Sequence, residues 1–496
     1  MNLTPFKNEP LANFSLANER EKMEAALKKV RGELGRYYSL RFGMVSNDKR
    51  QKVIQSVNPA DPSEIIGTVA SADLQDVENA LQIVKEGSSI WKRTPAKKRI
   101  ELVEKLADWM VEKKYELSAW MILEVGKNWR EADADVAEGI DFCRYYAREM
   151  NRLSEPQVTQ VVSGEHDVMG YYPKGVALVI APWNFPFAIL TGMTVAALVT
   201  GNTVIFKPAE QSSVIGAMLA QGLKAVGFPE SSFYFLPGDG EEIGPKLVND
   251  PRVDMIVFTG SAPVGFSIIE SAAKRPAAGQ RGVKKVIAEL GGKNALIIDE
   301  DADLDEALTA SVHSAFGFQG QKCSALSRLL VHEKVYDTFV PRFVEATRSL
   351  KMGDPAKPEY QVGPVIDSEA QARILKTIVE GKATMKVLYS APELPTKGYY
   401  VPPTIFETTD ISNKLFQNEI FGPVVVVKKI TSLEEGVKIA NSVPYALTGG
   451  LFSRSPSHID YVKEEFEVGN LYINRAITGA TVQRHPFGGF KYSGIG

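Results

Sequence analysis

The sequence predicts an α/β protein with a doubly wound parallel sheet. Strand-like segments rich in β-branched residues alternate with helical segments through the middle third of the chain, and each strand-like segment ends at glycine, proline or a polar residue. A second α/β unit begins after Gly292. Sheets of this kind bind ligands beyond the carboxyl ends of their strands, so we expect functional residues there.

Composition narrows the class of protein. The 496 residues are 44% hydrophobic, which predicts a globular chain with a large core. Lys and Arg total 57 against 60 for Asp and Glu, which gives a net charge of −3. The sequence shows no basic stripe of the kind that nucleic acid or an anionic membrane would require. We therefore expect a small-molecule partner, with no nucleic acid and no membrane.

Cysteine and histidine usage predicts no metal and a reducing compartment. Cys143 and Cys323 are the two cysteines, without a CxxC spacing, and the five histidines are scattered singly. The N-terminal residues lack the apolar run of a signal peptide, so a cytoplasmic protein is expected. The uncharged run 175–206 has the length of a membrane span, but prolines, asparagines and glycines divide it into a buried strand–helix–strand unit.

The elements follow in order along the chain. Apolar residues at helical spacing predict a helix within 16–38, and a helical block is expected over 73–148 with a short strand, 53–57, before it. The predicted strands of the first sheet are 176–180, 203–206, 233–236, 255–258 and 285–288. Helices are predicted up to about 199 and over 211–226, 241–248 and 264–273, and the second unit opens with a strand at 295–299.

Two strand ends are candidate anion cradles. Gly238-x-Gly240-x-x-x-Gly244 opens a helix and has one residue more than the dinucleotide fingerprint, so it is either a phosphate site or an ordinary turn. Thr259-Gly260-Ser261 is a second small strand end that leads into a helix. Either segment fits a pyrophosphate or a tight turn.

Two charged residues follow the second predicted strand. Lys207 would be partly desolvated and in need of a partner, unless it extends to solvent. Glu210 could accept two hydroxyls of a cofactor ribose and repel the extra phosphate of NADP, or it could be a carboxylate favoured by a helix N-terminus.

A candidate nucleophile and base come from later segments. Glu289 ends a strand before Leu290-Gly291-Gly292 and is either a general base or a buried ion-pair partner. Cys323 lies among small residues that leave its sulfur accessible, and a reactive thiol there needs nearby positive charge or backbone dipoles. Inert packing is the alternative for Cys323 and the expectation for Cys143.

Taken together, these segments resemble the aldehyde dehydrogenase superfamily from about Val53 to Gly494. The motifs occur in family order. They are Pro182-Trp183-Asn184-Phe185, Lys207-Pro208-Ala209-Glu210, Phe258-Thr259-Gly260-Ser261, Glu289-Leu290-Gly291-Gly292-Lys293, Gly320-Gln321-Lys322-Cys323, Glu419-Ile420-Phe421-Gly422-Pro423 and Pro486-Phe487-Gly488-Gly489. One small departure is Ala209, where many relatives have serine.

The resemblance implies a mechanism and a cofactor, NAD. Cys323 would attack the aldehyde carbon, with the oxyanion held by the Asn184 side chain and the Cys323 N–H, and Glu289 would activate the water that hydrolyses the thioester. The residues implied to bind NAD are Ile180, Ala181, Pro182, Trp183, Lys207, Ala209, Glu210, Gly240, Gly244, Thr259, Gly260, Ser261, Val264, Leu290, Glu419 and Phe421.

Four segments resemble one branch of the superfamily, the Δ1-pyrroline-5-carboxylate dehydrogenases. These segments are 5–10, 132–138, 323–328 and 469–475. Members of this branch oxidise glutamate γ-semialdehyde to glutamate in proline breakdown. The α-carboxylate and α-ammonium of this substrate need an anchor away from the nucleophile. The residues implied to bind the substrate are Glu138, Phe185, Ser324, Gly479, Ala480 and Phe487.

The resemblance also implies the domain organisation. An NAD-binding domain is expected from 1–158 and 175–291, and a catalytic domain from 292–470. An oligomerisation hairpin, 159–174, and a C-terminal segment, 471–496, are expected to support a homo-oligomer, a dimer or higher; relatives extend beyond the point equivalent to Gly496, so a short C-terminal contribution is expected.

Two alternatives stay open. One is a dehydrogenase of another semialdehyde, such as that of succinate, using NAD or NADP. The other is a catalytically silent relative that serves as a structural or binding protein. The presence of Cys323, Glu289 and Asn184 together favours an enzyme.

Overall fold

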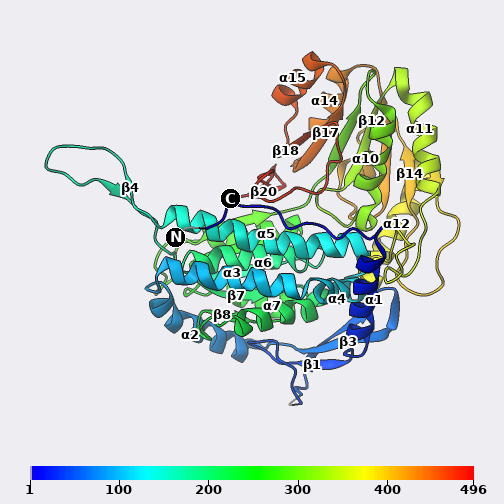
Figure 1. Ribbon diagram of the computed structural model, residues 1–496. Coiled ribbons are helices and arrows are strands. Elements are labelled where there is room, and N and C mark those ends of the chain that lie inside the picture. The colour runs from blue at the N-terminus through cyan, green and yellow to red at the C-terminus, as the bar shows by residue number, and fades with distance from the viewer. Residues whose placement is uncertain (1–2, 48) are drawn as a thin grey trace.

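A computed structural model describes residues 3–47 and 49–496, and two large sheets dominate it (Figure 1). The first has the strand order β20-β10-β9-β6-β7-β8, and all of its neighbours are parallel except β20. Its strands are β6 (Val176–Ile180), β7 (Thr203–Lys207), β8 (Phe233–Phe235), β9 (Met255–Thr259), β10 (Lys285–Glu289) and β20 (Gly494–Ile495).

The second sheet, in the upper lobe of Figure 1, has the order β13-β14-β15-β12-β11-β17-β18 and is parallel except for β13. Its strands are β11 (Asn294–Ile298), β12 (Leu326–His332), β13 (Lys386–Ser390), β14 (Thr404–Glu407), β15 (Val424–Ile430), β17 (Thr448–Phe452) and β18 (Asn470–Ile473). The smaller sheets contain β1 (Arg36–Tyr38), β2 (Val53–Asn58), β3 (Asp61–Ala70), β4 (Gln157–Val158), β5 (Val168–Met169), β16 (Tyr445–Ala446) and β19 (Phe490–Lys491).

Helices cover both faces of each large sheet. They are α1 (Ala17–Arg31), α2 (Leu74–Trp91), α3 (Ala96–Glu112), α4 (Lys114–Val125), α5 (Trp129–Leu153), α6 (Ala188–Val199), α7 (Ser213–Ala225), α8 (Gly240–Asn249), α9 (Ala262–Ala273), α10 (Leu304–Phe316), α11 (Glu333–Arg348), α12 (Ser368–Thr384), α13 (Lys414–Gln417), α14 (Leu433–Asn441) and α15 (Pro456–Glu465). Two 3₁₀ turns, η1 (Glu210–Ser212) and η2 (Gly317–Gly320), complete the set.

The alternation of apolar side chains along β6 explains these layers. Ala177 and Val179 pack into one core with α3 to α7, whereas Val176 and Leu178 pack into a second core with α2, α8 and α9. Successive strand side chains point to opposite faces, so a strand that is apolar at every position needs helices on both. The second sheet repeats this arrangement with its own two cores.

Most predicted elements are confirmed, with one correction near the N-terminus. The helix predicted within 16–38 ends at Arg31, because Gly32 and Gly35 follow and Gly35 adopts φ 76°, and Arg36–Tyr38 then forms β1 beside β3. The run 175–206 divides into β6, α6 and β7 as predicted. Among the described residues, no helix combines the length and the apolarity needed to cross a membrane.

The predicted domain bounds stay a prediction, but the sheets fall close to them. The hairpin β4–β5 begins at Gln157, and β18 extends the second sheet to Ile473. The hairpin projects away from the body in Figure 1. Met1, where the first predicted domain starts, lies outside the described residues.

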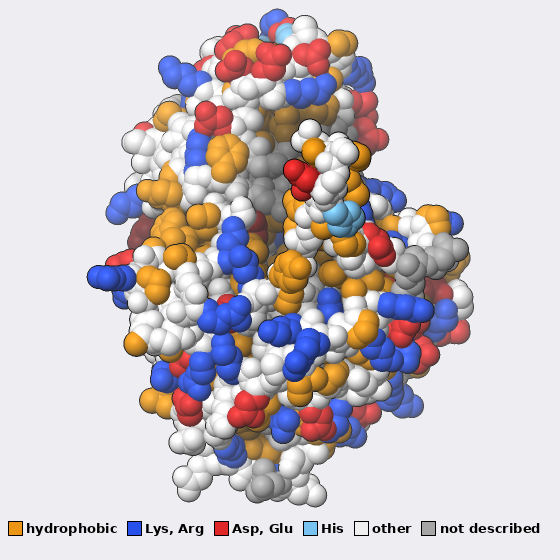
Figure 2. All heavy atoms as spheres, turned by 90° about the vertical axis from the view of Figure 1, so that its left-hand side faces the viewer, with side chains coloured by type: hydrophobic (Ala, Val, Ile, Leu, Met, Phe, Trp, Pro, Cys, Tyr) orange, Lys and Arg blue, Asp and Glu red, His pale blue; other side chains and the backbone are white. Residues whose placement is uncertain are grey.

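The surface drawn in Figure 2 mixes the two signs of charge. Basic, acidic and apolar side chains are interspersed over this face, and its upper half is hollowed. A face of this kind lacks the single-sign stripe that tracks a nucleic acid backbone.

Candidate active site

The loop that carries Cys323 is fixed to the start of β11. The Asn294 side chain donates from Nδ2 to the carbonyl of Cys323 at 2.7 Å and to the carbonyl of Ala325 at 2.9 Å. A Cβ at Gly292 would lie 2.5 Å from the Cys323 carbonyl, so glycine is required for this close approach. The backbone around the nucleophile is therefore held from one side by the Gly291-Gly292 segment.

A turn in an unfavourable conformation precedes this loop. Phe318 and Gln319 have φ values of 47° and 56°, in the left-handed region. Such a residue without the freedom of glycine costs about 1–3 kcal/mol, and the cost must be offset by surrounding contacts. The Gln319 side chain provides one, since its Nε2 donates to the Pro364 carbonyl at 2.7 Å.

Asn184 and Glu289 converge on the same loop. Asn184 is buried, and its Nδ2 donates to the carbonyl of Gln321 at 3.0 Å, two residues before Cys323. Glu289 ends β10, and its Oε2 is buried without a hydrogen-bond partner. Burial raises the pKa of Glu289 to about 7, although contact with the Gly489 backbone opposes the shift. A carboxyl with this pKa exchanges protons readily near neutral pH.

The charges around Cys323 differ from the expectation that the site lowers the pKa of this thiol. Among the described residues, no cation contributes to the shift at this thiol, and the ammonium of the adjacent Lys322 pairs with Glu131 at 2.7 Å. Burial, with the negative charges of Glu419 and Glu289, raises the pKa of Cys323 to about 12, while the backbone N–H groups of Ser324 and Cys323 oppose the shift. Backbone dipoles thus favour the ionised form of this thiol. Cys143 is fully buried inside α5, as expected of an inert cysteine.

Glu419 lies on the far side of the two glycines. Its Oε1 accepts a hydrogen bond from the Gly292 N–H at 2.9 Å, and burial raises its pKa to about 7. A Cβ at Gly291 would overlap the other carboxylate oxygen. The backbone of Phe421 adopts φ 56°. Its ring packs edge to face on that of Trp183, with the ring centroids 5.6 Å apart. Phe421 thus faces the loop after β6, whereas Glu419 lies against the Gly291-Gly292 segment.

The ends of β6 and β7 lie side by side, as the parallel sheet requires. Lys207 Nζ is 2.8 Å from Glu210 Oε1, which also accepts a hydrogen bond from the Gly240 N–H at 2.8 Å. Lys207 therefore has the partner that its burial demands, and Glu210 is held at the end of the strand. The Ala181 N–H donates to the Lys207 carbonyl, which places the Ile180-Ala181-Pro182 segment beside them.

The two candidate anion cradles differ. The Asp239 side chain caps α8, and Glu241 and Glu242 occupy its first turn, so the cradle predicted at Gly238 to Gly244 is already filled with negative charge. Ser261 makes no side-chain cap to α9, which leaves the first N–H groups of that helix available. The site at Thr259-Gly260-Ser261 is therefore the better candidate cradle and the one at Gly238 the weaker, and both stay predictions.

The remaining residues of the cofactor prediction lie around these ends. Val264 is half exposed in the first turn of α9, and Leu290 packs against Gly265 of that helix. Ala209 lies between Lys207 and η1, and Gly244 lies within α8, where a Cβ would meet open space.

Apart from Glu138 in α5, the predicted substrate residues lie in loops. Phe185 and Phe487 are partly exposed, and Ser324 is buried beside the nucleophile. Gly479 adopts φ 73° in an exposed loop after β18, followed by Ala480. No hydrogen bond joins Ser324 to that loop within the described part of the chain, so this grouping stays a prediction.

Two ion pairs at the start of α5 were not predicted, although Glu138 of the same helix was named as a substrate residue. Glu131, Asp135 and Glu138 recur at helical spacing, and the first two pair with Lys322 and Lys127. Burial beside Asp135 raises the pKa of Glu138 to about 8. The i, i+4, i+7 spacing of carboxylates was the available signal, but only the fold supplies the lysines.

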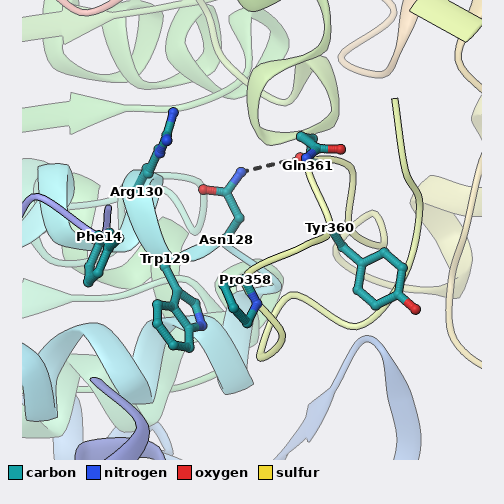
Figure 3. A pocket seen from close by; sticks show the side chains of 7 residues that line it. All are labelled: Phe14, Asn128, Trp129, Arg130, Pro358, Tyr360 and Gln361. Carbon is teal, nitrogen blue, oxygen red and sulfur yellow. Dashed lines mark hydrogen bonds between the residues drawn. The ribbon is translucent and has the colours of Figure 1, made fainter. Parts of the chain in front are cut away.

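One cavity of the described residues lies elsewhere (Figure 3). Its volume is about 200 Å³. It is lined by Phe14, Asn128, Trp129, Arg130, Pro358, Tyr360 and Gln361. The Asn128 amide donates to the Gln361 carbonyl, as drawn, and its oxygen caps α5. None of the predicted site residues lines this cavity, and no role is assigned to it.

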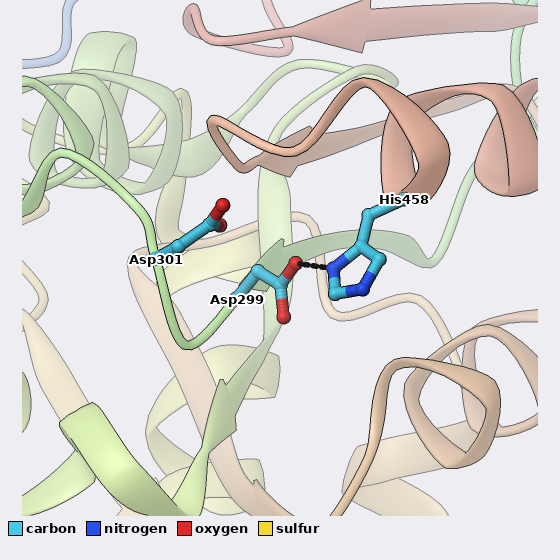
Figure 4. Close-up of side chains that lie close together, drawn as sticks. All are labelled: Asp299, Asp301 and His458. Carbon is cyan, nitrogen blue, oxygen red and sulfur yellow. Dashed lines mark hydrogen bonds and ion pairs between the residues drawn. The ribbon is translucent and has the colours of Figure 1, made fainter.

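One acidic cluster with a histidine has the composition of a metal site (Figure 4). Asp299, Asp301 and His458 lie together, but His458 Nδ1 contacts Asp299 at 2.6 Å and Asp301 accepts from the Ser453 hydroxyl at 2.8 Å. Asp299 follows the carboxyl end of β11, whereas Cys323 lies at its start. The cluster is explained as a link between β11 and α15.

Comparison with known sequences identifies the class. The sequence model of the aldehyde dehydrogenase family matches residues 44–496. The chain belongs to this family, and the resemblance drawn from the motifs is confirmed.

Its relatives include one narrower group. The chain is 44% identical to 1-pyrroline-5-carboxylate dehydrogenase of Geobacillus thermodenitrificans over 494 residues, 99% of this chain and 95% of that protein. The structure of 1-pyrroline-5-carboxylate dehydrogenase from Thermus with bound NAD superposes with a TM-score of 0.96 at 44% identity, covering 100% of this chain and 96% of that one.

A longer protein also contains this fold. Proline utilization A from Bdellovibrio bacteriovorus matches all of this chain with a TM-score of 0.97 at 48% identity, but only 52% of its own length is covered. The chain therefore spans about half of that relative. The predicted α/β fold is confirmed by both superpositions.

Proposed function

We propose that this protein is an NAD-dependent 1-pyrroline-5-carboxylate dehydrogenase, which oxidises L-glutamate γ-semialdehyde to L-glutamate. The observation that carries the proposal is the convergence of Asn184 and Glu289 on the Cys323 loop. The names of the close relatives support the choice of substrate.

The first half of the reaction uses Cys323 and Asn184. The Cys323 thiol gives up its proton to solvent, the thiolate attacks the aldehyde carbon, and the new carbon–sulfur bond converts the carbonyl oxygen to an oxyanion. The Asn184 Nδ2 and the Cys323 N–H are the donors proposed for this oxyanion, since preorganised donors stabilise charge that develops in the transition state. Loss of a hydride from the same carbon leaves a thioester on Cys323.

The second half uses Glu289. Its carboxylate takes a proton from a water molecule, and the hydroxide attacks the thioester carbon, breaks the carbon–sulfur bond and releases the carboxylic acid product and the Cys323 thiolate. The proton held by Glu289 then returns to the sulfur or leaves to solvent. The unpartnered Oε2 and the pKa of about 7 suit a general base.

The residues at the strand ends fit NAD. Glu210 is the proposed acceptor for the ribose hydroxyls on the adenine side, and the uncapped start of α9 at Ser261 is the proposed pyrophosphate site. Glu419 is proposed for the nicotinamide ribose, with Phe421 beside the ring. When bound, NAD supplies the hydride acceptor. The other residues of the cofactor prediction are proposed to complete the site; of these, Gly240 and Gly244 belong to the acidic start of α8.

The far end of the pocket is proposed to recognise the amino acid group. Ser324 and the N–H groups of Gly479 and Ala480 are the proposed anchor for the α-carboxylate, and Phe185 and Phe487 for the aliphatic stem. Glu138 is the proposed partner of the ammonium, because a cation there would favour the ionised form of a carboxyl that burial holds protonated.

We also propose that the chain forms a homo-oligomer, a dimer or higher, in the cytoplasm. Valines and tyrosines along the β4–β5 hairpin and just after it are exposed, which is typical of a segment that packs against another subunit. The division into NAD-binding, catalytic and oligomerisation regions remains part of this proposal.

A substrate and cofactor matrix tests the function. Absorbance of NADH should rise with glutamate γ-semialdehyde, with a lower kcat/KM for succinate semialdehyde and propanal. Cys323→Ala should abolish turnover, whereas the matched control Cys143→Ala should retain it.

A second variant tests the choice of substrate. Ser324→Ala should raise KM for the amino acid aldehyde and leave KM for propanal unchanged. Preference for succinate semialdehyde in the unaltered protein would instead establish the alternative substrate, and absence of turnover with any aldehyde would favour a silent relative.

A further inference from the structure

Lys127 carries a charge in the interior next to the proposed site. It follows the left-handed Gly126 between α4 and α5, and its side chain is 0% exposed. Its Nζ lies 3.1 Å from Oδ2 of Asp135, whose side chain is also 0% exposed. Removing two charges from water is costly, and an apolar pair would fill the space without that cost. A specific contact between the pair and its surroundings would explain why lysine and aspartate occupy these positions.

Two aromatic rings flank the ammonium. The distance from Lys127 Nζ to the ring centroid is 4.0 Å for Phe185 and 4.4 Å for Phe318. Both are within the range in which a cation is attracted to the face of an aromatic ring. Phe185 directly follows Asn184, and Phe318 belongs to the left-handed turn before Cys323. One ammonium thus contacts both segments that bear the reacting groups.

The partner of Lys127 reaches the first of these segments again. Asp135 Oδ1 accepts a hydrogen bond from the Ala188 N–H, at the start of α6, at 2.6 Å. The loop between β6 and α6, which holds Asn184, is therefore fixed to α5 both through the ring of Phe185 and through this backbone group.

The second segment depends on contacts because its backbone is strained. Phe318 is fully buried, and its ring contacts Trp183 as well as Lys127. The Gly126 carbonyl, adjacent to Lys127, lies 3.4 Å from Gln319 Nε2 and accepts a second, weaker hydrogen bond from that amide. The Gly126-Lys127 segment thus supports both left-handed residues.

We propose that Lys127 is a positioning residue that, together with Asp135, sets the distance between the Asn184 loop and the Cys323 loop. It touches neither substrate nor the reacting atoms. The proposal rests on the roles proposed for Asn184 and Cys323 and does not depend on which aldehyde is the substrate.

The test compares two buried lysines of the same helix pair. Lys127→Met removes the ammonium, and Lys127→Met with Asp135→Asn removes the whole pair without leaving an unpaired charge. Lys114→Met is the matched control, because Lys114 pairs with the buried Asp133 of α5 at 3.2 Å and contacts neither ring. Circular dichroism and thermal unfolding establish that each variant is folded at the assay temperature.

Two readouts follow the position of the reacting groups. The first is the rate at which iodoacetamide alkylates Cys323, measured by mass spectrometry, which needs no aldehyde. The second is kcat and KM for the aldehyde that the unaltered protein prefers. Both Lys127 variants should lose roughly tenfold or more in kcat/KM and change the alkylation rate, since small misplacements of reacting groups cost up to about 100-fold. Lys114→Met should stay within about twofold in both readouts by the additivity of distant sites.

A double-mutant cycle with Phe318→Leu separates positioning from general destabilisation. Lys127→Met and Phe318→Leu should be non-additive in kcat/KM, because each breaks the same contact. A folded Lys127→Met/Asp135→Asn variant with unaltered kcat/KM and alkylation rate would overturn the proposal, as would full additivity in the cycle. Failure of the proposed function would look different, since the unaltered protein would then not turn over glutamate γ-semialdehyde.

Discussion

Burial is the main influence on the protonation of both Glu289 and Cys323, and at Cys323 the negative charges of Glu419 and Glu289 act in the same direction. The same desolvation that makes the Glu289 carboxyl a base near neutral pH also keeps the thiol protonated in the free protein. Backbone N–H groups are the favourable contribution at the sulfur. The balance between these effects predicts a strong dependence of the reaction on pH.

The pH dependence of thioester hydrolysis should report Glu289. The carboxyl must be ionised to accept a proton, so below a pKa of about 7 hydrolysis slows, and it should rise with pH through about 7 to a plateau. Glu289→Gln should lower kcat by roughly 10²–10⁴-fold and accumulate acyl-enzyme that mass spectrometry detects.

The control for this variant is Glu124→Gln. Glu124 is another buried carboxyl with a pKa raised to about 7, but it accepts hydrogen bonds from the Val214 and Ile215 N–H groups at α7. Its replacement should lower stability and leave the pH profile of hydrolysis in place. A single-turnover profile of Glu289→Gln that matches the unaltered protein would disprove the assignment.

Individual residues of the site were only partly predictable from sequence. Cys323 and Glu289 each had an ordinary structural interpretation, and their motifs in family order favoured the catalytic one. Of the two expected sources of activation at the thiol, only backbone dipoles are found, because Lys322 pairs with Glu131, and the Lys127–Asp135 pair was not predicted. Both depend on which side chains the fold brings together, which sequence spacing does not contain.

At the scale of elements, α8 and α9 start from the same sheet edge with opposite electrostatics. Asp239, Glu241 and Glu242 fill the start of α8, while α9 begins at an uncapped, exposed Ser261. Glycine spacing alone made α8 the more conspicuous candidate in the sequence. The decisive difference is the acidic first turn of α8. Its carboxylates already interact with the positive end of the helix dipole and would repel a phosphate group.

A carboxylate placed at Ser261 should therefore compete with the cofactor. Ser261→Asp should stabilise α9 by about 0.3–1 kcal/mol through capping and the dipole. It should also raise the Kd for NAD by about tenfold or more, because a repulsion of only about 1.4 kcal/mol produces that factor. Fluorescence titration with NAD and the Tm measure the two effects.

Ser267→Asp is the matched control for this substitution, since Ser267 is also exposed on α9 but lies beyond its first turn. It adds the same charge and should leave the Kd for NAD within about twofold, given the short range of the terminal effect. An equal Kd for Ser261→Asp and the unaltered protein would place the pyrophosphate elsewhere.

Elements of the buried sheets were the most predictable part of the fold. Their strands are apolar at successive positions and bounded by clear turn residues, so their existence follows from the sequence. The helix expected within 16–38 was predicted too long because buried Tyr37 and Tyr38 continue the apolar pattern as a strand. Apolar spacing alone does not separate these two cases near Gly32 and Gly35.

For the whole molecule, the two large sheets meet at the loops that carry the reacting groups. β10 ends at Glu289, Gly292 leads directly into β11, and β11 returns to the Cys323 loop through Asn294. The glycines at this junction let the two sheets approach closely. The β4–β5 hairpin forms a separate two-stranded sheet and projects away from both large sheets in Figure 1.

The hairpin should be required for oligomerisation and not for folding. An isolated two-stranded hairpin is at best marginally stable, and this one exposes Val161 at 90%, with Tyr172 after it at 89%. Val161→Asp with Tyr172→Asp should shift the molar mass measured by light scattering towards that of a single chain, because buried charges at a subunit interface are costly. Val283→Asp is the control, since Val283 is 76% exposed but lies on the body, and it should leave the mass unchanged. An unchanged mass in the hairpin variant, with the unaltered protein an oligomer, would assign the subunit interface to another surface.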